Sequence, residues 1–115
     1  VEVIIHEIAP SNPVSMDKGL AITLVQNLLK NAIAHNIPQG KVIIDVSANS
    51  FSISNTSASK APLDEKLIYN RFYRSTTNEE STGLGLSLVQ TIVRVTDALS
   101  IRYEYNGMHC FTVSW

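Results

Sequence analysis

Residues 81–86 place two glycines, Gly83 and Gly85, between a polar segment and an apolar run with helical periodicity at 86–95. Glycine lets a ligand approach the backbone closely, and the N-terminus of a helix offers unpaired N–H groups and a partial positive charge. This combination is suited to binding a phosphate group. Gly-x-Gly also occurs in ordinary turns, so the residues upstream decide what the motif means.

A second set of polar residues recurs every four positions, at Asn27, Asn31 and His35. This spacing puts them on one side of a helix, and at about 100° per residue Asn31 and His35 fall at the edge of its apolar face. An amide left unpaired there would cost about 1–3 kcal/mol. Two interpretations stay open. The amides bind a ligand, with an Asn carbonyl oxygen suited to Mg²⁺, or they are structural and bond to backbone or water.

Three motifs follow one another along the chain. An asparagine box covers 27–32, a phenylalanine box at 67–72 runs into Arg-Phe-Tyr-Arg at 71–74, and a second glycine box covers 82–86. Their order resembles the catalytic, ATP-binding domain of bacterial sensor histidine kinases, and the resemblance extends over nearly the whole chain. It implies the GHKL superfamily, which also holds gyrase, the large heat-shock chaperones and the mismatch-repair ATPases, and with it the Bergerat fold.

The resemblance implies roles for individual residues. Asn31 would be the ligand of Mg²⁺, Asn27 its helper near the phosphates, and His35 would stand close to the phosphate chain. Arg71 and Arg74 would be cations near the γ-phosphate and, with Asn31, the catalytic set. A triphosphate needs positive charge, N–H donors and a metal, and these residues supply all three. The implied nucleotide-binding set is completed by Asn55, Thr82, Gly83, Leu84, Gly85 and Leu86.

The first glycine box departs from the family pattern. The family has Asp-x-Gly-x-Gly at the end of the central strand, whereas this chain has Asn55, Ser57 and Ser59 at those positions. Asn55 can still accept a hydrogen bond from the adenine amino group, without the strength of a charged acceptor. Serine lacks the freedom of glycine to adopt a positive φ. Two alternatives follow: a domain that binds ATP through an altered adenine pocket, and a degenerate interaction module that no longer binds nucleotide.

The resemblance also implies an activity and partners. The domain would bind MgATP and donate the γ-phosphate to a histidine on a separate dimerisation domain, from which the phosphate passes to the receiver domain of a response regulator. We expect the isolated chain to be a monomer that is nearly inactive as a kinase. We also expect it to be a cytoplasmic domain of a membrane-anchored protein.

Two other patterns are set aside. His6 and Glu7 resemble the His-Glu pair at which such kinases phosphorylate themselves, but Pro10 and Pro13 follow at once and the surrounding run has the pattern of a strand. The hydrolytic clamps of the superfamily use a Glu on the asparagine-box helix to activate water. Gln26 stands just before the box in this chain and cannot act as a base.

The composition is that of a single domain over residues 1–115, with 44% apolar and 17% charged residues. A net charge of −1 gives no general attraction to nucleic acid or to an anionic membrane. Cys110 is the one cysteine, which fits a reducing compartment, and its spacing from the histidines is not that of a zinc site. No apolar run reaches the roughly 18 residues of a membrane span. Because the chain opens directly on a strand pattern without Met, we expect an excised fragment of a larger kinase.

The elements that must position these residues follow from the periodicity of apolar side chains. Asn106-Gly107 is the strongest hairpin signal in the chain. The order β-α-β-β-α-α-β-β predicts an α/β (α+β) two-layer sandwich, with a mixed, mostly antiparallel five-stranded sheet and three helices on one face. The expected strands are 3–8, 41–47, 51–54 and the two arms of the hairpin, and the expected helices are 17–36, 63–72 and 83–96.

Overall fold

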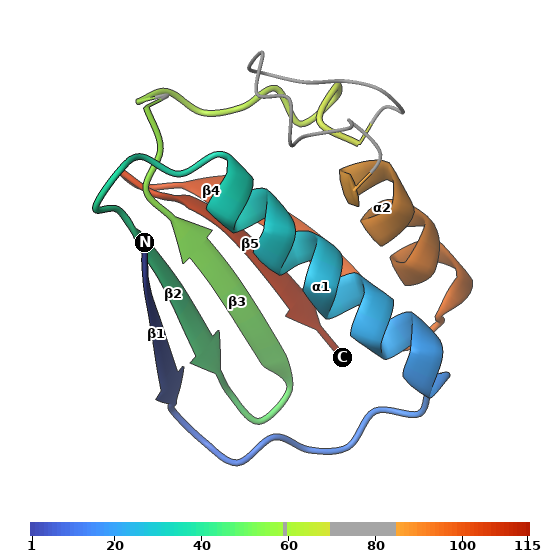
Figure 1. The fold of residues 1–115 in the computed structure, drawn as a ribbon. Coiled ribbons are helices and arrows are strands. Elements are labelled where there is room, and N and C mark those ends of the chain that lie inside the picture. Colours follow the sequence, from blue (N-terminus) through green and yellow to red (C-terminus); the bar gives the residue numbers. More distant parts are fainter. Residues whose placement is uncertain (59, 70–84) are drawn as a thin grey trace.

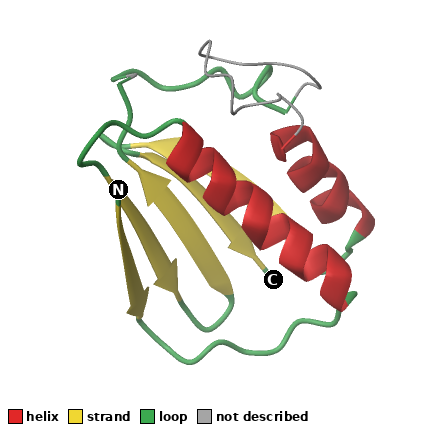
Figure 2. Cartoon of the chain, viewed as in Figure 1, coloured by secondary structure: helices red, strands yellow, loops and turns green. Residues whose placement is uncertain are grey.

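The structure, a computed structural model, describes residues 1–58, 60–69 and 85–115. Strands form one layer and helices lie together against one face of it, so the two-layer α/β sandwich is confirmed (Figures 1 and 2). The elements in chain order are β1 (Glu2–Glu7), α1 (Lys18–Ala34), β2 (Lys41–Val46), β3 (Ser50–Asn55), α2 (Gly85–Val95), β4 (Ser100–Tyr105) and β5 (His109–Ser114).

The five strands form one sheet in the order β1-β2-β3-β5-β4. β1 pairs with β2 in parallel, and the other three pairings are antiparallel, which confirms the mixed, mostly antiparallel sheet. Parallel neighbours need a long crossover, and α1 supplies it. As a result α1 lies across the sheet, with its two ends at opposite ends of the strands (Figure 1).

Helix α1 begins where the Asp17 side chain accepts a hydrogen bond from the Leu20 N–H at 3.0 Å, which makes Asp17 the N-cap. His35 is the C-cap residue. Leu24, Leu28 and Ala32 are buried at a spacing of four and hold the helix on the sheet. Each leucine buried in this way contributes about 1.5–3 kcal/mol of hydrophobic stabilisation.

Alternation along the strands directs one set of side chains toward the helices. Ile53 pairs with Phe111 and Asn55 pairs with His109 across β3 and β5, and all four are buried. The turn between β4 and β5 contains Gly107 with a φ of 98°, which confirms the hairpin predicted from Asn106-Gly107. The core therefore runs along the sheet face under α1 and α2, and its last row next to the end of β3 is polar.

The helix expected at 63–72 is not found in the part of it that the structure describes. The N–H groups of Leu67 and Ile68 both bond to the Asp64 carbonyl, which closes a single turn. Ile68 is the buried apolar residue of this turn, and short helices with little packing are marginal in water. Two helices, not three, therefore cover the sheet among the described residues. Within those residues neither helix is long and apolar enough to cross a membrane.

Candidate functional site

Most of the predicted site residues that the structure describes lie at one end of the sandwich. Asn27 and Asn31 lie in the C-terminal half of α1, and His35 caps its end. Asn55 is the last residue of β3, and Gly85 is the first of α2. These three element ends lie at the same end of the molecule, the upper end in Figure 1. We call this region, defined by these five residues, the polar end of the sandwich.

Asn27 joins the two helices at the polar end. Its Nδ2 donates to the Thr23 carbonyl at 2.7 Å, one turn back. A Cβ placed on Gly85 would lie 3.3 Å from Asn27 Oδ1, so the amide packs directly against the start of α2. The asparagine box and the end of the second glycine box are therefore in contact, although they are far apart in sequence. Leu86 follows in the first turn of α2 and packs, half-buried, against the core.

Asn31 lies one turn beyond Asn27 and is half-buried. Its main-chain carbonyl accepts the His35 N–H at 3.2 Å. Across residues 1–58, 60–69 and 85–115, no hydrogen bond involves its side chain, whereas the Asn27 amide is tied to the backbone. The structural interpretation of the stripe therefore applies to Asn27 in part, while Asn31 keeps the bonding capacity that a ligand would need.

Asn55 is 3% exposed at the end of β3. Its Nδ2 donates to the Thr56 carbonyl at 2.9 Å. Its Oδ1 accepts no hydrogen bond from the residues that the structure describes. No buried side-chain nitrogen or oxygen among the described residues lacks a hydrogen-bond partner, so the unpaired Oδ1 reaches solvent and can accept from a bound molecule.

A knot of hydrogen bonds beside Asn55 was not predicted from the sequence. Thr56 Oγ1 donates to Asn36 Oδ1 at 2.5 Å and accepts the Lys41 N–H at 2.9 Å. Asn36 Nδ2 donates to the Ala32 and Lys41 carbonyls at 3.2 and 2.9 Å. The knot ties the end of α1 to the start of β2 and the end of β3. The one signal for it in the sequence is Gly40, where a side chain would leave no room for Asn36 and Thr56.

Two histidines line the inner side of the polar end. Burial lowers the pKa of His35 below its usual 6.5, and the charge of His109 lowers it further. His109 is 4% exposed, and its Nδ1 lies 2.6 Å from the Tyr103 hydroxyl, which also accepts the Leu63 N–H at 3.0 Å. Burial raises the pKa of Tyr103, so this phenol stays neutral. His109 is therefore a satisfied histidine of the sheet face.

Ser57, which takes a glycine position of the family, has no backbone strain. Gln39, with a φ of 62°, is the one non-glycine residue of positive φ among the described positions, so Ser57 adopts a conformation open to any residue. His6, whose pattern was set aside, lies exposed on β1 with Nδ1 3.1 Å from Asp45 Oδ1. The other predicted positions, Arg71, Arg74, Thr82, Gly83, Leu84 and the Ser59 of the first glycine box, lie outside the described residues.

The donor set fits Mg²⁺ held jointly with a substrate. Within the part of the chain that the structure describes, no three His, Cys, Asp or Glu side chains gather in a way that could hold a metal ion. Asn31 Oδ1 is a hard, neutral oxygen without a competing partner there. Mg²⁺ keeps several waters and is commonly bound by one or two protein oxygens plus substrate phosphates. A metal here would therefore depend on the phosphates for most of its ligands.

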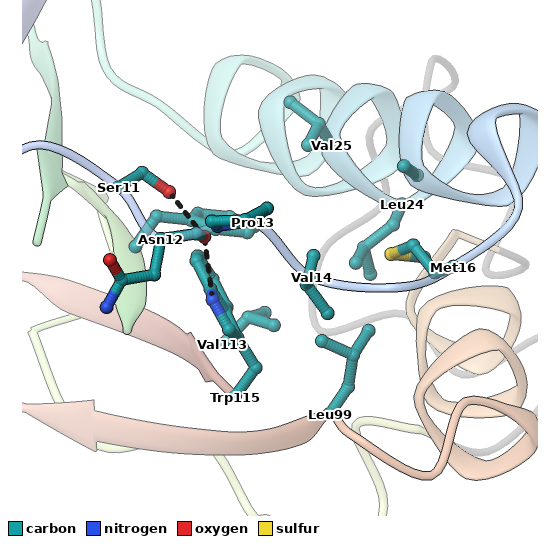
Figure 3. A pocket seen from close by; sticks show the side chains of 12 residues that line it. Ser11, Asn12, Pro13, Val14, Met16, Leu24, Val25, Leu99, Val113 and Trp115 are labelled. Atoms are coloured by element: carbon teal, nitrogen blue, oxygen red, sulfur yellow. Dashed lines mark hydrogen bonds between the residues drawn. The ribbon is translucent and has the colours of Figure 1, made fainter. Parts of the chain in front are cut away.

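The opposite end of the sandwich holds a cavity of about 330 Å³, which we call the basal cavity (Figure 3). The loop before α1, the first turns of α1 and the end of β5 enclose it. The Trp115 indole N–H and the Ser11 hydroxyl both donate to the Asn12 carbonyl, at 3.1 and 3.2 Å. None of the predicted site residues lines it. The lining residues are Ser11, Asn12, Pro13, Val14, Met16, Ala21, Leu24, Val25, Phe51, Leu99, Val113 and Trp115.

The family model and the relatives that are similar to this chain in sequence agree with one another. The family model described as "Histidine kinase-, DNA gyrase B-, and HSP90-like ATPase" matches residues 16–115. Sensor histidine protein kinase HK06 of Streptococcus pneumoniae is 36% identical over 73 residues, which is 61% of this chain and 16% of that protein. Sensor histidine kinase YvrG of Bacillus subtilis is 33% identical over 92 residues, 70% of this chain and 15% of that protein. The chain thus spans about a sixth of the length of these relatives.

Solved structures share the fold. The catalytic domain of histidine kinase ThkA superposes with a TM-score of 0.73 at 22% identity, covering 97% of this chain and 76% of that one. ThkA in complex with the response regulator protein TrrA gives 0.69 at 21% identity, covering 96% of this chain and 32% of that one. At these identities the likeness supports the fold alone.

Proposed function

The chain belongs to the family of histidine kinase-, DNA gyrase B- and HSP90-like ATPases, as a catalytic domain of the sensor histidine kinase type, and we propose that it binds MgATP at the polar end of the sandwich. The observation that carries this proposal is the contact between the Asn27 amide and Gly85 at the start of α2. It joins the amide stripe to a helix N-terminus, where a phosphate is stabilised by N–H donors and the helix dipole.

Each part of the nucleotide has a candidate partner at this end. Asn31 would hold Mg²⁺ together with the phosphates, and Gly85 at the start of α2 would lie against the phosphate chain. Arg71 and Arg74 are proposed as the cations near the γ-phosphate. When bound, Mg²⁺ would neutralise phosphate charge, and the chain's own residues would mainly hold the triphosphate in position. Thr82, Gly83, Leu84 and Leu86 complete the proposed phosphate-binding segment.

Asn55 is the proposed contact for adenine. Its Oδ1 lacks a partner in the described structure and could accept a hydrogen bond from the adenine amino group. The degenerate, non-binding alternative was motivated by the loss of the family's Asp and of its glycines. An unsatisfied acceptor at this position and an unstrained Ser57 favour a site with an altered base contact over a module that has lost its nucleotide.

The reaction that we propose is transfer of the γ-phosphate to a histidine on a separate dimerisation domain, and then to the receiver domain of a response regulator. The names of the relatives HK06 and YvrG support the first step, and the second step is proposed from the same membership of the sensor histidine kinases. The cytoplasmic placement, the membrane anchor and the monomeric state of the isolated chain belong to the same proposal.

The test is phosphorylation of the full-length kinase by γ-labelled ATP in the presence of Mg²⁺. We expect label that is labile in acid and stable in base, as phosphohistidine is, and we expect Asn31→Ala to abolish it. Lys30→Ala is the matched control, because Lys30 is an exposed neighbour on the same helix. Nucleotide binding without labelled histidine would contradict the phosphotransfer step, and absence of nucleotide binding would favour the degenerate module.

A further inference from the structure

We propose that Thr56 is a positioning residue that determines base specificity, because it locks the Asn55 amide with its carbonyl oxygen toward the nucleotide. The locked amide makes the site select purines with a 6-amino group over purines with a 6-oxo group. This inference rests on the proposed function of the polar end. A carboxylate at position 55 would not need such a lock, because both of its oxygens are acceptors.

The side-chain amide of Asn55, unlike a carboxylate, has two different ends. A carboxylate presents an acceptor whichever way it turns, whereas an amide presents an acceptor on one side and a donor on the other. A half turn of the Asn55 side chain would replace Oδ1 by Nδ2. A donor at that position would donate to the 6-oxo group of guanine or hypoxanthine and would not pair with the 6-amino group of adenine. An unrestrained asparagine would therefore discriminate poorly.

The first part of the lock is the hydrogen bond from Asn55 Nδ2 to the Thr56 carbonyl, at 2.9 Å. A carbonyl oxygen can only accept, so the side-chain atom that faces it must be the amide nitrogen. Oδ1 is then the end that remains for another donor.

The second part of the lock holds Thr56 itself. Its hydroxyl donates to Asn36 Oδ1 at 2.5 Å and accepts the Lys41 N–H at 2.9 Å, and its own N–H donates to the Lys41 carbonyl at 3.1 Å. Asn36 is fixed in turn, because its Oδ1 also accepts the Ile37 N–H at 2.9 Å. Both functions of the Thr56 hydroxyl, donor and acceptor, are thus used to orient the peptide unit that holds Asn55.

Gly40 allows the knot to close. A Cβ on this residue would clash with Asn36 Oδ1 and would lie 2.5 Å from Thr56 Oγ1. The Gly40 backbone is also tied down, since its N–H donates to the Ile37 carbonyl and its carbonyl accepts the Glu2 N–H, both at 3.0 Å. The end of α1, the start of β2 and the end of β3 therefore form one rigid support behind Asn55.

The test compares the dissociation constants of Mg-ATP and Mg-ITP, which differ in the 6-substituent and in the proton on N1. It uses Thr56→Val, which removes the hydroxyl at nearly constant shape, and Thr56→Ser, which keeps it. We expect the wild-type chain to prefer ATP by about tenfold or more, as for a site built around one hydrogen bond. Thr56→Val should reduce this ratio to about threefold or less, because the amide can turn. Thr56→Ser should retain it.

Asn55→Asp supplies the decisive control. In this background both side-chain oxygens are acceptors, so Thr56→Val should leave the ATP/ITP ratio unchanged. If the role of Thr56 is purely structural, Thr56→Val will weaken the binding of ATP and of ITP equally in both backgrounds. That result would overturn the lock. If the wild-type chain binds neither nucleotide, the proposed function fails and the inference fails with it. If ATP binds and the ratio survives Thr56→Val, the inference alone fails.

A measurement on the unmodified protein guards against variants that do not fold. The side-chain NH₂ resonances of Asn55 should show one proton strongly protected from exchange with solvent, with and without nucleotide, because it bonds to the Thr56 carbonyl. Two equally and rapidly exchanging amide protons in the free protein would contradict the lock.

Discussion

The two ends of α1 meet opposite requirements. At the first end, around the basal cavity, the polar groups are satisfied by one another: Asp17 caps the helix and Trp115 donates to the Asn12 carbonyl. At the polar end, Asn31 and the Oδ1 of Asn55 have no such partners among the described residues. Both ends rest on the same apolar core, so packing alone does not explain why one end is left unsatisfied.

The difference shows where bonding capacity is left open. Among the described residues no buried side-chain nitrogen or oxygen lacks a hydrogen-bond partner, so the unpaired amide groups of Asn31 and Asn55 reach solvent. Such groups are available to a ligand, whereas the paired groups around the basal cavity are not. We therefore expect substitutions at the two ends to separate stability from binding.

The largest effect on stability is expected for Leu24→Ala, beside the basal cavity. Leu24 is 2% exposed and lines the basal cavity, so truncation enlarges a void and should lower the free energy of unfolding by about 2–5 kcal/mol. Urea denaturation measures it, and the affinity for nucleotide should stay within about twofold under folding conditions. Ile22→Ala, at a residue 48% exposed on the same helix, should change stability by about 0.5 kcal/mol or less. Equal losses in both variants would contradict this account.

Asn31→Ala should show the reverse pattern. Removing the proposed Mg²⁺ ligand is expected to weaken binding of MgATP by about 100-fold, or about 2.7 kcal/mol. The free energy of unfolding should not fall, because the variant loses a side chain with no hydrogen bond in the described structure. Titration and urea denaturation of the same sample check both statements. A marked loss of stability with normal binding would assign Asn31 to the structure instead.

Asn55→Asp should have an intermediate effect, in which affinity for ATP and stability change in opposite directions. A charged acceptor strengthens the contact with the adenine amino group, so affinity for ATP should rise about threefold to tenfold. Stability should fall by about 1–3 kcal/mol, since a carboxylate is buried and the bond to the Thr56 carbonyl is lost. Calorimetric titration and denaturant unfolding measure the two changes. Lower affinity together with lower stability would contradict the proposed base contact.

The smallest effect is a pH dependence at the polar end. Burial, and secondarily the charge of His109, lower the pKa of His35 below its usual 6.5. Below pH 6.5 the unfolded chain binds more protons at His35 than the folded chain does. The stability that neutral His35 contributes is therefore lost as the pH falls through 6.5 toward the pKa of the folded state. Urea denaturation between about pH 5 and 8 should show this slope. His35→Gln should reduce it, and identical slopes in both proteins would contradict the assignment.

Periodicity was enough to predict most of the fold. The apolar spacing on α1, the alternation in β3 and β5 and the Asn106-Gly107 turn are local patterns, and the structure confirms each of them. The helix expected at 63–72 was wrong over its described part, because apolar spacing does not reveal whether the sheet offers a surface to pack on. Ile68 alone is buried there.

The site was predictable only where one motif carries the information. The contact between Asn27 and Gly85 follows from two recognisable boxes. The knot of Asn36, Gly40 and Thr56 joins side chains from three elements, and nothing in their spacing indicates that they meet. The basal cavity was also unforeseen, since it depends on how the loop before α1 crosses the end of β5 (Figure 3).

The most direct test of the central claim is calorimetric titration of this chain with a non-hydrolysable ATP analogue, with and without Mg²⁺. We expect saturable, one-to-one binding that depends on Mg²⁺ and is lost in Asn31→Ala. No heat of binding at millimolar nucleotide, in a chain shown to be folded, would contradict it and would leave the polar end of the sandwich as a surface for contact with other domains.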